Sequence, residues 1–515
     1  MNRHSEHPSV LIVGAGPVGL SLANLLGIEG VSCMLIERND GCIPEPRAVV
    51  VDGESMRTFQ TMGLVDELAA DMRQGFVADY QNAEGVHLFS SDLRPRPYGF
   101  CLQNAFDQPT LERSLLAGLD RFDCVTVHHG TELLNFEVGA EGVQARIRTR
   151  GEVESIIRAD YLVGTDGGRS MVRAQLGIAM QGERLPQKWL VVDTIDHHPG
   201  DDPECRFYCD PKRPAMTILR PRGERRWEWM LMPGETDAEM LEDDRIDALL
   251  AAHTDPAQVH VYRRCVYGFS AVVAERFAQG PVLLAGDAAH MTPPFAGQGL
   301  NAGIRDVRNL AWKLARVLNG RLPETLLATY DQERHDAARA MVDMAVALGN
   351  QIQPTDPEAA AARDAHFAAL NRDPEAARSF NRESGASLAD VRLLKGWFDS
   401  GSAGGGRMLH QPSIQTPAGE ARLDELLGDG FSVLCCGGAK VPESFAANSL
   451  WRALAPHPVS VDPACGLSEA DFGGVLDPAD PALVLIRPDR FVMAQLRPED
   501  SAIDTLDRLR AVLEG

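Results

Sequence analysis

The sequence has few basic residues for its size and no long apolar run. Its 515 residues include 50 Lys and Arg against 73 Asp and Glu, which gives a formal net charge of −23. Nucleic acids and anionic membrane surfaces attract clustered cations, so neither is expected to be a partner. No apolar run reaches the roughly 20 residues of a membrane-spanning helix, and the first residues lack the apolar core of a signal peptide. We therefore expect a cytoplasmic protein.

The ten cysteines show no spacing typical of a metal site or a redox pair. Cys435 and Cys436 are adjacent, whereas a redox pair has two residues between its cysteines. We expect free thiols in a reducing compartment and no bound metal.

A glycine-rich turn near the start of the chain is the first positive signal. The apolar run 10–13 predicts a buried parallel strand, and residues 20–26 predict a helix. Between them, Gly14 makes a tight turn and Gly19 lets the helix pack close to the strand. Gly16 lets the backbone approach a pyrophosphate, which lies at the positive N-terminus of the helix. This segment predicts a dinucleotide-binding turn.

An acidic residue supports the same prediction. The apolar run 33–36 predicts a second strand that ends at Glu37. A carboxylate at this distance from the glycines accepts hydrogen bonds from the ribose of a bound dinucleotide. An acid here favours a free 2′-hydroxyl, and therefore FAD or NAD over NADP. The turn alone does not separate FAD from NAD.

A second glycine-rich segment lies far along the chain. The apolar run 282–285 predicts a buried strand that ends at Gly286-Asp287, and further glycines lead into a helix. Such a segment places a carboxylate and several backbone N–H groups beside a ligand. Two turns of this kind suggest one long ligand that is held at both ends. A third apolar run ends near Asp166-Gly167 and a basic helix start.

These segments together resemble one protein family. They follow each other as in the group A flavoprotein monooxygenases, the class of p-hydroxybenzoate hydroxylase and phenol hydroxylase, over about residues 8–345. Shorter strings at 206–214 and 226–234 resemble 3-(3-hydroxyphenyl)propionate hydroxylases. The resemblance implies an α/β fold with a Rossmann-like FAD-binding domain of the p-hydroxybenzoate hydroxylase type, a β-sheet substrate domain and a C-terminal thioredoxin-like domain.

The same resemblance implies domain bounds. They are an FAD-binding domain at 1–78, 100–175 and 268–345, a substrate-binding sheet at 79–99 and 176–267, a helical segment and linker at 346–405, and a thioredoxin-like domain at 406–515. Because the last domain has no Cys-x-x-Cys pair, we expect it to be structural. Association into a homodimer is left open.

Residues around the cofactor also receive implied roles. Glu37 would bind the adenosine ribose, Arg47 the pyrophosphate or the ribityl chain, and Asp287 a ribityl hydroxyl. Gln108 matches a glutamine on the flavin side. Backbone N–H groups near Leu300 would face the flavin where its reduced form is negative. The residues implied to bind FAD are Gly14, Gly16, Pro17, Val18, Gly19, Glu37, Arg38, Arg47, Gln108, Leu133, Asp166, Gly286, Asp287, Gly299, Leu300 and Asn301.

The resemblance implies a reaction as well. NADH or NADPH reduces FAD, O2 adds to form a flavin C4a-hydroperoxide, and its distal oxygen enters a phenolic ring ortho or para to the hydroxyl. The backbone carbonyl of Pro294 would lie near the hydroxylated carbon. Tyr208, Tyr267 and His290 are candidates for the base that deprotonates the phenol, although the family pattern makes His290 part of the scaffold. The spacing of none of the three is decisive.

The substrate contacts have several interpretations. Trp227 and Trp229 share one face of a predicted strand, because side chains alternate along it. With Tyr208 and Pro294 they are the candidate substrate contacts, and ordinary core packing is the alternative. The expected substrate is a phenolic acid of the 3-(3-hydroxyphenyl)propionate type in aromatic catabolism. The alternatives are a tailoring hydroxylase for a larger polycyclic, flavonoid or polyketide phenol, and a flavin-binding protein without turnover.

Overall fold

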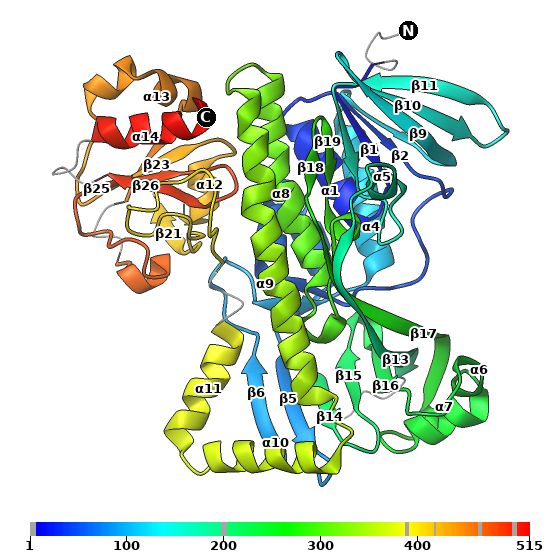
Figure 1. Ribbon diagram of the computed structural model, residues 1–515. Coiled ribbons are helices and arrows are strands. Elements are labelled where there is room, and N and C mark those ends of the chain that lie inside the picture. Colours follow the sequence, from blue (N-terminus) through cyan, green and yellow to red (C-terminus); the bar gives the residue numbers. More distant parts are fainter. Residues whose placement is uncertain are drawn as a thin grey trace.

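A six-stranded sheet carries the first glycine-rich turn at its centre (Figure 1). The computed structural model describes residues 7–196, 203–386, 391–416, 419–461, 466–496 and 502–514. In order across the sheet, the strands are β18 (Ala278–Gln279), β19 (Val282–Leu284), β12 (Tyr161–Gly164), β1 (Val10–Val13), β2 (Cys33–Ile36) and β8 (Val125–His128). All neighbours except β18 and β19 are parallel. The strands β1, β2, β12 and β19 are buried along their whole length, as a parallel sheet covered on both faces requires.

Helices and two small sheets surround this parallel sheet. The helix after the first glycine turn, α1 (Pro17–Ile28), packs against the helix after the second, α8 (Gly299–Leu318). The small sheets consist of β9 (Thr131–Gly139), β10 (Gly142–Thr149) and β11 (Glu154–Ala159), and of β3 (Val50–Asp52), β7 (Gln103–Ala105) and β4 (Arg73–Gln74). The shorter helices are α2 (Gly53–Thr61), α3 (Val65–Ala70), α4 (Gln108–Ala117) and α5 (Met171–Gln175). The predicted Rossmann-like architecture is confirmed.

An eight-stranded sheet forms the lower half of the molecule in Figure 1. Its strands, in order, are β20 (His290–Met291), β17 (Val259–Ala274), β13 (Met180–Asp196), β16 (Glu224–Met230), β15 (Ala215–Leu219), β14 (Cys205–Cys209), β5 (Val77–Asn82) and β6 (His87–Asp92). One face is covered by α6 (Asp237–Met240) and α7 (Asp243–Leu250). Because β20 follows directly on the second glycine segment, this sheet reaches the end of the parallel sheet.

A long helix connects the two sheets. α9 (Ala328–Ile352) runs past the parallel sheet to the eight-stranded sheet, where α10 (Pro357–Leu370) and α11 (Pro374–Ala386) continue across the strands (Figure 1). Near the start of α9, the hydroxyl of Tyr330 donates to the carbonyl of Leu284 at 2.7 Å. None of the helices in the described ranges combines the length and apolarity needed to cross a membrane.

The C-terminal domain has the strand order of a thioredoxin fold. β23 (Ser432–Cys436) and β24 (His457–Ser460) are parallel, and β25 (Ala482–Ile486) and β26 (Val492–Leu496) follow as an antiparallel pair, in the order β24-β23-β25-β26. α13 (Ser449–Leu454) lies between the first two strands in sequence, and α14 (Ala502–Glu514) follows the last. A hairpin, β21 (Ser413–Thr416) and β22 (Gly419–Arg422), and α12 (Leu423–Leu427) precede them. The predicted thioredoxin-like domain is confirmed, and its Cys435 and Cys436 are buried and not joined in a disulfide.

Buried ion pairs join this domain to the rest of the chain. The carboxylate of Glu333 on α9 pairs with Arg487 from the loop after β25 and with Lys313 on α8, each at 2.7 Å. Burial alone would raise the pKa of Glu333, but the two cations hold it below its usual range. Arg57 on α2 and Asp424 on α12 form another buried ion pair at 2.6 Å. The domain is therefore attached through charges that are removed from water.

Candidate active site

Two of the three glycines in the first turn are required by packing, and the third is not. A Cβ on Gly14, whose φ is +106°, would lie 2.6 Å from the carbonyl oxygen of Thr165. A Cβ on Gly19 would collide with the carbonyl of Gly14. Among the described residues, a Cβ on Gly16 would meet no atom within 4 Å, and Gly16 stands before α1 without a side-chain cap. The open space at this helix N-terminus fits a pyrophosphate.

The two glycine-rich segments meet at Val18. Its side chain lies 3.0 Å from where a Cβ on Gly286 would stand and 2.6 Å from where one on Gly303 would stand. Pro17 occupies the first turn of α1, where a missing N–H costs nothing. Segments far apart in sequence therefore form one continuous wall, as a single long ligand requires.

The predicted ribose-binding acid lies beside the first turn. Glu37 accepts a hydrogen bond from the backbone N–H of Ala15 at 2.9 Å and from the side chain of Asn39 at 2.7 Å. Arg38 is exposed next to it. Leu133 is buried in β9, close to β2. This end of the wall thus joins one carboxylate to the glycine turn.

Asp166, which the sequence also predicts to contact the cofactor, caps a helix in the structure. One carboxylate oxygen of Asp166 accepts hydrogen bonds from the backbone N–H groups of Met171 (2.8 Å) and Val172 (3.2 Å) and so caps α5. Its second oxygen is buried without a hydrogen-bond partner among the described residues. That oxygen stays available to a ligand hydroxyl or N–H.

The second glycine segment presents a carboxylate and a helix start to a cavity. Gly286 has a φ of +61°, and the following Asp287 faces the cavity. Burial raises the pKa of the Asp287 carboxyl, against the effect of His290 and Arg47. In the described part of the chain, no side chain caps the start of α8 at Gly299, so its first N–H groups are open to a ligand.

Gly299 and Leu300 at this helix start line the cavity. The side chain of Asn301 does not take part, because it accepts from the backbone N–H of Asp52 at 3.0 Å and donates to the carbonyl of Gly297 at 2.7 Å. Only the backbone of Asn301 is left for a cofactor.

The segment 46–48 is held from two directions. The side-chain oxygen of Gln108 accepts from the backbone N–H groups of Arg47 (3.2 Å) and Ala48 (2.7 Å). From the eight-stranded sheet, the guanidinium of Arg226 donates to the carbonyls of Pro46 (2.7 Å) and Arg47 (2.6 Å). These bonds leave the Arg47 side chain free to face the cavity. Gln108 therefore positions this segment through its oxygen.

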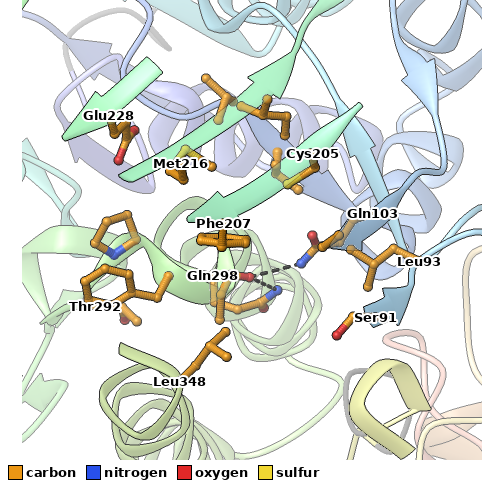
Figure 2. Close-up of a pocket in the computed structure, with 18 of the residues that line it drawn as sticks. Ser91, Leu93, Gln103, Cys205, Phe207, Met216, Glu228, Thr292, Gln298 and Leu348 are labelled. Carbon is orange, nitrogen blue, oxygen red and sulfur yellow. Dashed lines mark hydrogen bonds between the residues drawn. The ribbon is translucent and has the colours of Figure 1, made fainter. Parts of the chain in front are cut away.

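A cavity of about 740 Å³ separates the second glycine segment from the eight-stranded sheet (Figure 2). Strand register and the two-residue alternation decide which side chains face it, because residues opposite each other in a sheet share a face. One row across the sheet reads Phe89, Tyr80, Phe207, Met216, Glu228 and Val191. The next row reads Ser91, Ala78, Cys205, Ile218 and Arg226. All of these residues line the cavity.

Aromatic rings form one end of the cavity. Tyr80 stacks on Phe89 with ring centroids 4.0 Å apart and on Phe207 at 4.6 Å. Phe367 from α10 stacks on Phe89 at 4.7 Å, and Phe380 from α11 closes the group edge-on. Flat apolar walls of this kind suit an aromatic ligand.

The turn at Pro294 forms the floor of the cavity. Pro294 is exposed there, and its carbonyl accepts from the backbone N–H of Gly297 at 2.8 Å. The carbonyl of Ala296 accepts from the side-chain amides of Gln103 (3.0 Å) and Gln298 (3.3 Å), drawn as dashed lines in Figure 2. The turn is therefore fixed on both sides, which keeps Pro294 in place.

The structure corrects the predicted aromatic substrate contacts. Tyr208, Trp227 and Trp229 lie on the other face of the sheet, under α6 and α7. There Tyr208 packs on His253 with ring centroids 4.3 Å apart, and the two tryptophans stack at 5.9 Å. The pairing of the tryptophans on one face was predicted correctly, but they belong to the core. Arg226 and Glu228, which alternate with them, face the cavity.

His290 is likewise placed away from the cavity. It is 1% exposed and bonds Asp306 at 2.7 Å. Asp306 also accepts from the backbone N–H of Gly286 at 3.0 Å and from Arg334 at 2.9 Å. The histidine thus supports the glycine turn through Asp306, in agreement with a scaffold role and not with proton transfer to a substrate.

Comparison with known proteins defines the class. Residues 7–345 match the family described as FAD binding domain, and residues 406–511 match the HcaD C-terminal domain. A 3-(3-hydroxy-phenyl)propionate/3-hydroxycinnamic acid hydroxylase of Burkholderia cenocepacia is 37% identical over 95% of this chain and 93% of its own length. The hydroxylase of the same name from Comamonas testosteroni is 34% identical over 98% and 97%.

Solved structures are similar as well. Aklavinone-11 hydroxylase, in a ternary complex with FAD and aklavinone, superimposes with a TM-score of 0.80 at 27% identity over 100% of both chains. The flavin-dependent monooxygenase PieE, with FAD and substrate, has the same TM-score at 23% identity. The fold is that of flavin-dependent monooxygenases. Within that class, the chain belongs to the family of FAD-dependent aromatic hydroxylases, enzymes that use NAD(P)H and O2 to hydroxylate phenolic rings.

Proposed function

We propose that FAD binds along the wall formed by the two glycine-rich segments. Glu37 would hold the adenosine ribose, the open side of Gly16 the pyrophosphate, and Asp287 a ribityl hydroxyl. The first N–H groups of α8, at Gly299 and Leu300, would face the flavin ring. Reduced FAD supplies the activated oxygen from O2 when it is bound. The support for this arrangement is the space beside Gly16 and the uncapped start of α8.

We also propose domain bounds that divide most of the two sheets between two domains, with β5, β17 and β20 at the boundary. The FAD-binding part would consist of 1–78, 100–175 and 268–345, the substrate sheet of 79–99 and 176–267, the connecting helices of 346–405 and the thioredoxin-like part of 406–515. A homodimer and a cytoplasmic location stay predictions from the sequence.

We infer that the substrate is a phenolic acid related to 3-(3-hydroxyphenyl)propionate. One observation carries this proposal: a single cavity extends from Asp287 and Gly299 to the stacked rings of Tyr80, Phe89 and Phe207. A phenol on that aromatic wall would lie between the flavin end and α10. Pro294 would border the reacting ring, and the apolar side chains would keep water from the activated oxygen.

A larger polycyclic phenol is a second candidate. The cavity volume of about 740 Å³ supports it, as does the likeness to aklavinone-11 hydroxylase. Part of this volume would hold the flavin ring, which favours the smaller phenol. A substrate panel that contains both kinds of phenol separates the two candidates.

The test uses the purified full chain. We expect a yellow protein that retains FAD, and an NADH or NADPH oxidation rate that rises when a suitable phenol is added. The panel contains 3-(3-hydroxyphenyl)propionate, 3-hydroxycinnamate and a polycyclic phenol, and 18O2 should deliver one labelled atom into the product. Protein that cannot be reconstituted with FAD would contradict the cofactor assignment. NADH consumption that yields only hydrogen peroxide with every phenol would contradict hydroxylation by this chain.

A further inference from the structure

One carboxylate lies on the sheet wall of the cavity, in the row of the aromatic rings and one position beyond Met216. Glu228 on β16 lies opposite Val191 on β13 and Met216 on β15, so apolar side chains flank it on both sides. Figure 2 shows Glu228 pointing into the same space as Met216, Phe207 and Thr292. In the part of the chain that the structure describes, its carboxylate has neither a hydrogen bond nor an ion pair.

The cations nearest to this carboxylate are already paired. Arg226 bonds both oxygens of Asp193, at 2.7 and 3.0 Å, as well as the carbonyls of the segment 46–48. Arg263 on β17 bonds Asp193 at 2.7 Å and the hydroxyl of Tyr267 at 2.6 Å. Asp193 and these two arginines therefore form their ion pairs without Glu228.

The other charged groups of the cavity have different surroundings. Asp287 lies at the second glycine turn, Arg47 on the segment 46–48, and Glu383 and His366 at the edge formed by α11 and α10. Both Glu383 and His366 are exposed. Glu228 is thus the acid that stands on the sheet wall beside the aromatic rows.

The surroundings make this carboxyl a better base than an exposed glutamate. Burial raises the pKa of Glu228, and the negative Asp193 adds to the increase. Arg226 and Arg263 act in the opposite direction without cancelling it. A base with a pKa moved toward neutrality accepts a proton more effectively near physiological pH.

We propose that Glu228 is the general base that accepts the proton of the substrate's phenolic hydroxyl. This inference rests on the proposed hydroxylase function. The O–H bond of the phenol breaks, and its electron pair stays on the oxygen and enriches the ring carbons ortho and para to it. The same proton forms an O–H bond on Glu228. After oxygen has entered the ring, the displaced ring proton leaves to water, and Glu228 returns its proton to the original phenol oxygen.

The experiment compares three variants of the holoenzyme with the phenol that the wild type hydroxylates fastest. In E228Q, kcat for hydroxylated product should fall about a hundredfold or more, as for loss of a general base, with a much smaller change in KM. E228D keeps a carboxylate and should retain part of kcat. E137Q removes the same charge from an exposed position on β9, away from the cavity, and is the matched control. FAD content and thermal unfolding show whether each variant is folded.

The pH profile separates catalysis from structure. Glu228 must be ionised to accept a proton, so kcat of the wild type should fall as pH decreases through its raised pKa. E228Q should lack this acidic limb, whereas E228D and E137Q should keep it. Folded E228Q with a kcat within about threefold of the wild type, or with the same acidic limb, would overturn the assignment of the base while leaving the hydroxylase function intact. If E228Q does not fold, E228D provides the test. An unchanged kcat together with an unshifted acidic limb in E228D would overturn the assignment of the base as well. Absence of any hydroxylated product in the wild type would overturn both proposals.

Discussion

Glu333 and Glu228 are two carboxylates that this chain treats in different ways. At the domain junction, Glu333 receives Arg487 and Lys313, each at 2.7 Å, and its pKa is lowered. On the cavity wall, Glu228 has apolar neighbours and no partner among the described residues, and its pKa is raised.

The two environments suit different roles, because one carboxylate holds elements together and the other is able to react. A carboxylate that the protein satisfies with its own cations is locked in its ionised form and holds elements together. A carboxylate that is left unsatisfied has a free energy that depends on its protonation and on what enters the cavity. Asp287 belongs with Glu228, because burial raises its pKa as well.

The largest effect is expected at the junction. Glu333→Ala leaves Arg487 and Lys313 buried without their shared partner, so the free energy of unfolding should fall by about 3–5 kcal/mol. Urea denaturation monitored by circular dichroism measures this change. The matched control is Glu132→Ala, which breaks an exposed pair with Arg148 and should cost no more than about 1 kcal/mol. Equal losses of unfolding free energy in both variants would show that the buried pairs of Glu333 contribute no more than the exposed pair.

The junction pair also predicts the acid dependence of stability. The pKa of Glu333 in the folded chain lies below its ordinary value of 4.5, so its contribution is fully present above that pH. It is lost as pH falls through the lower folded pKa. In Glu333→Ala, the decrease in stability over this acidic range should therefore be shallower than in the wild type.

A smaller effect is expected from the cofactor carboxylate. If Asp287 accepts a ribityl hydroxyl, Asp287→Ala removes a hydrogen bond to a charged group, worth about 1.5–3 kcal/mol. FAD affinity, measured by fluorescence titration of the apoprotein, should fall about tenfold to a hundredfold. The unfolding free energy of the apoprotein should stay about the same, because the Asp287 side chain is exposed to the cavity and has no hydrogen-bond partner among the described residues. Unchanged FAD affinity would exclude Asp287 from the cofactor site.

The smallest effects distinguish the two faces of the eight-stranded sheet. Phe207→Leu changes the cavity wall and should raise KM for the phenol by a factor of about 3–10, in line with roughly 1 kcal/mol for an aromatic contact. Trp229→Phe changes the core under α7 and should lower the unfolding free energy by about 1–2 kcal/mol without an effect on KM. The reverse pattern in steady-state kinetics and denaturation would show that the faces are assigned the wrong way round.

The fold was predictable from the sequence because its signals are local. The glycine turn at Gly14 to Gly19 and the segment at Gly286-Asp287 each carry their strand, turn and helix within a short stretch. The steric roles of Gly14 and Gly19 are visible in the structure as collisions that a Cβ would cause. The open space at Gly16 is what remains for a ligand.

The site on the eight-stranded sheet was predictable only in part. Alternation along β16 groups Trp227 with Trp229 and Arg226 with Glu228, but it does not say which pair faces the cavity. That depends on α6 and α7, which cover the tryptophan face. A charged pair that alternates with two large apolar residues is itself a signal that the charged face meets a ligand, since a strand covered on both faces seldom buries charge without a use.

Because side chains alternate between the two faces of the sheet, only a few positions on these strands shape the cavity. Four of them are Cys205, Phe207, Met216 and Ile218, whose neighbours in the chain point away from the cavity. Changes at these four positions alter the shape of the cavity without disturbing the tryptophans on the other face. Evolution, or a directed library, is therefore able to exchange one aromatic substrate for another while the scaffold stays unchanged.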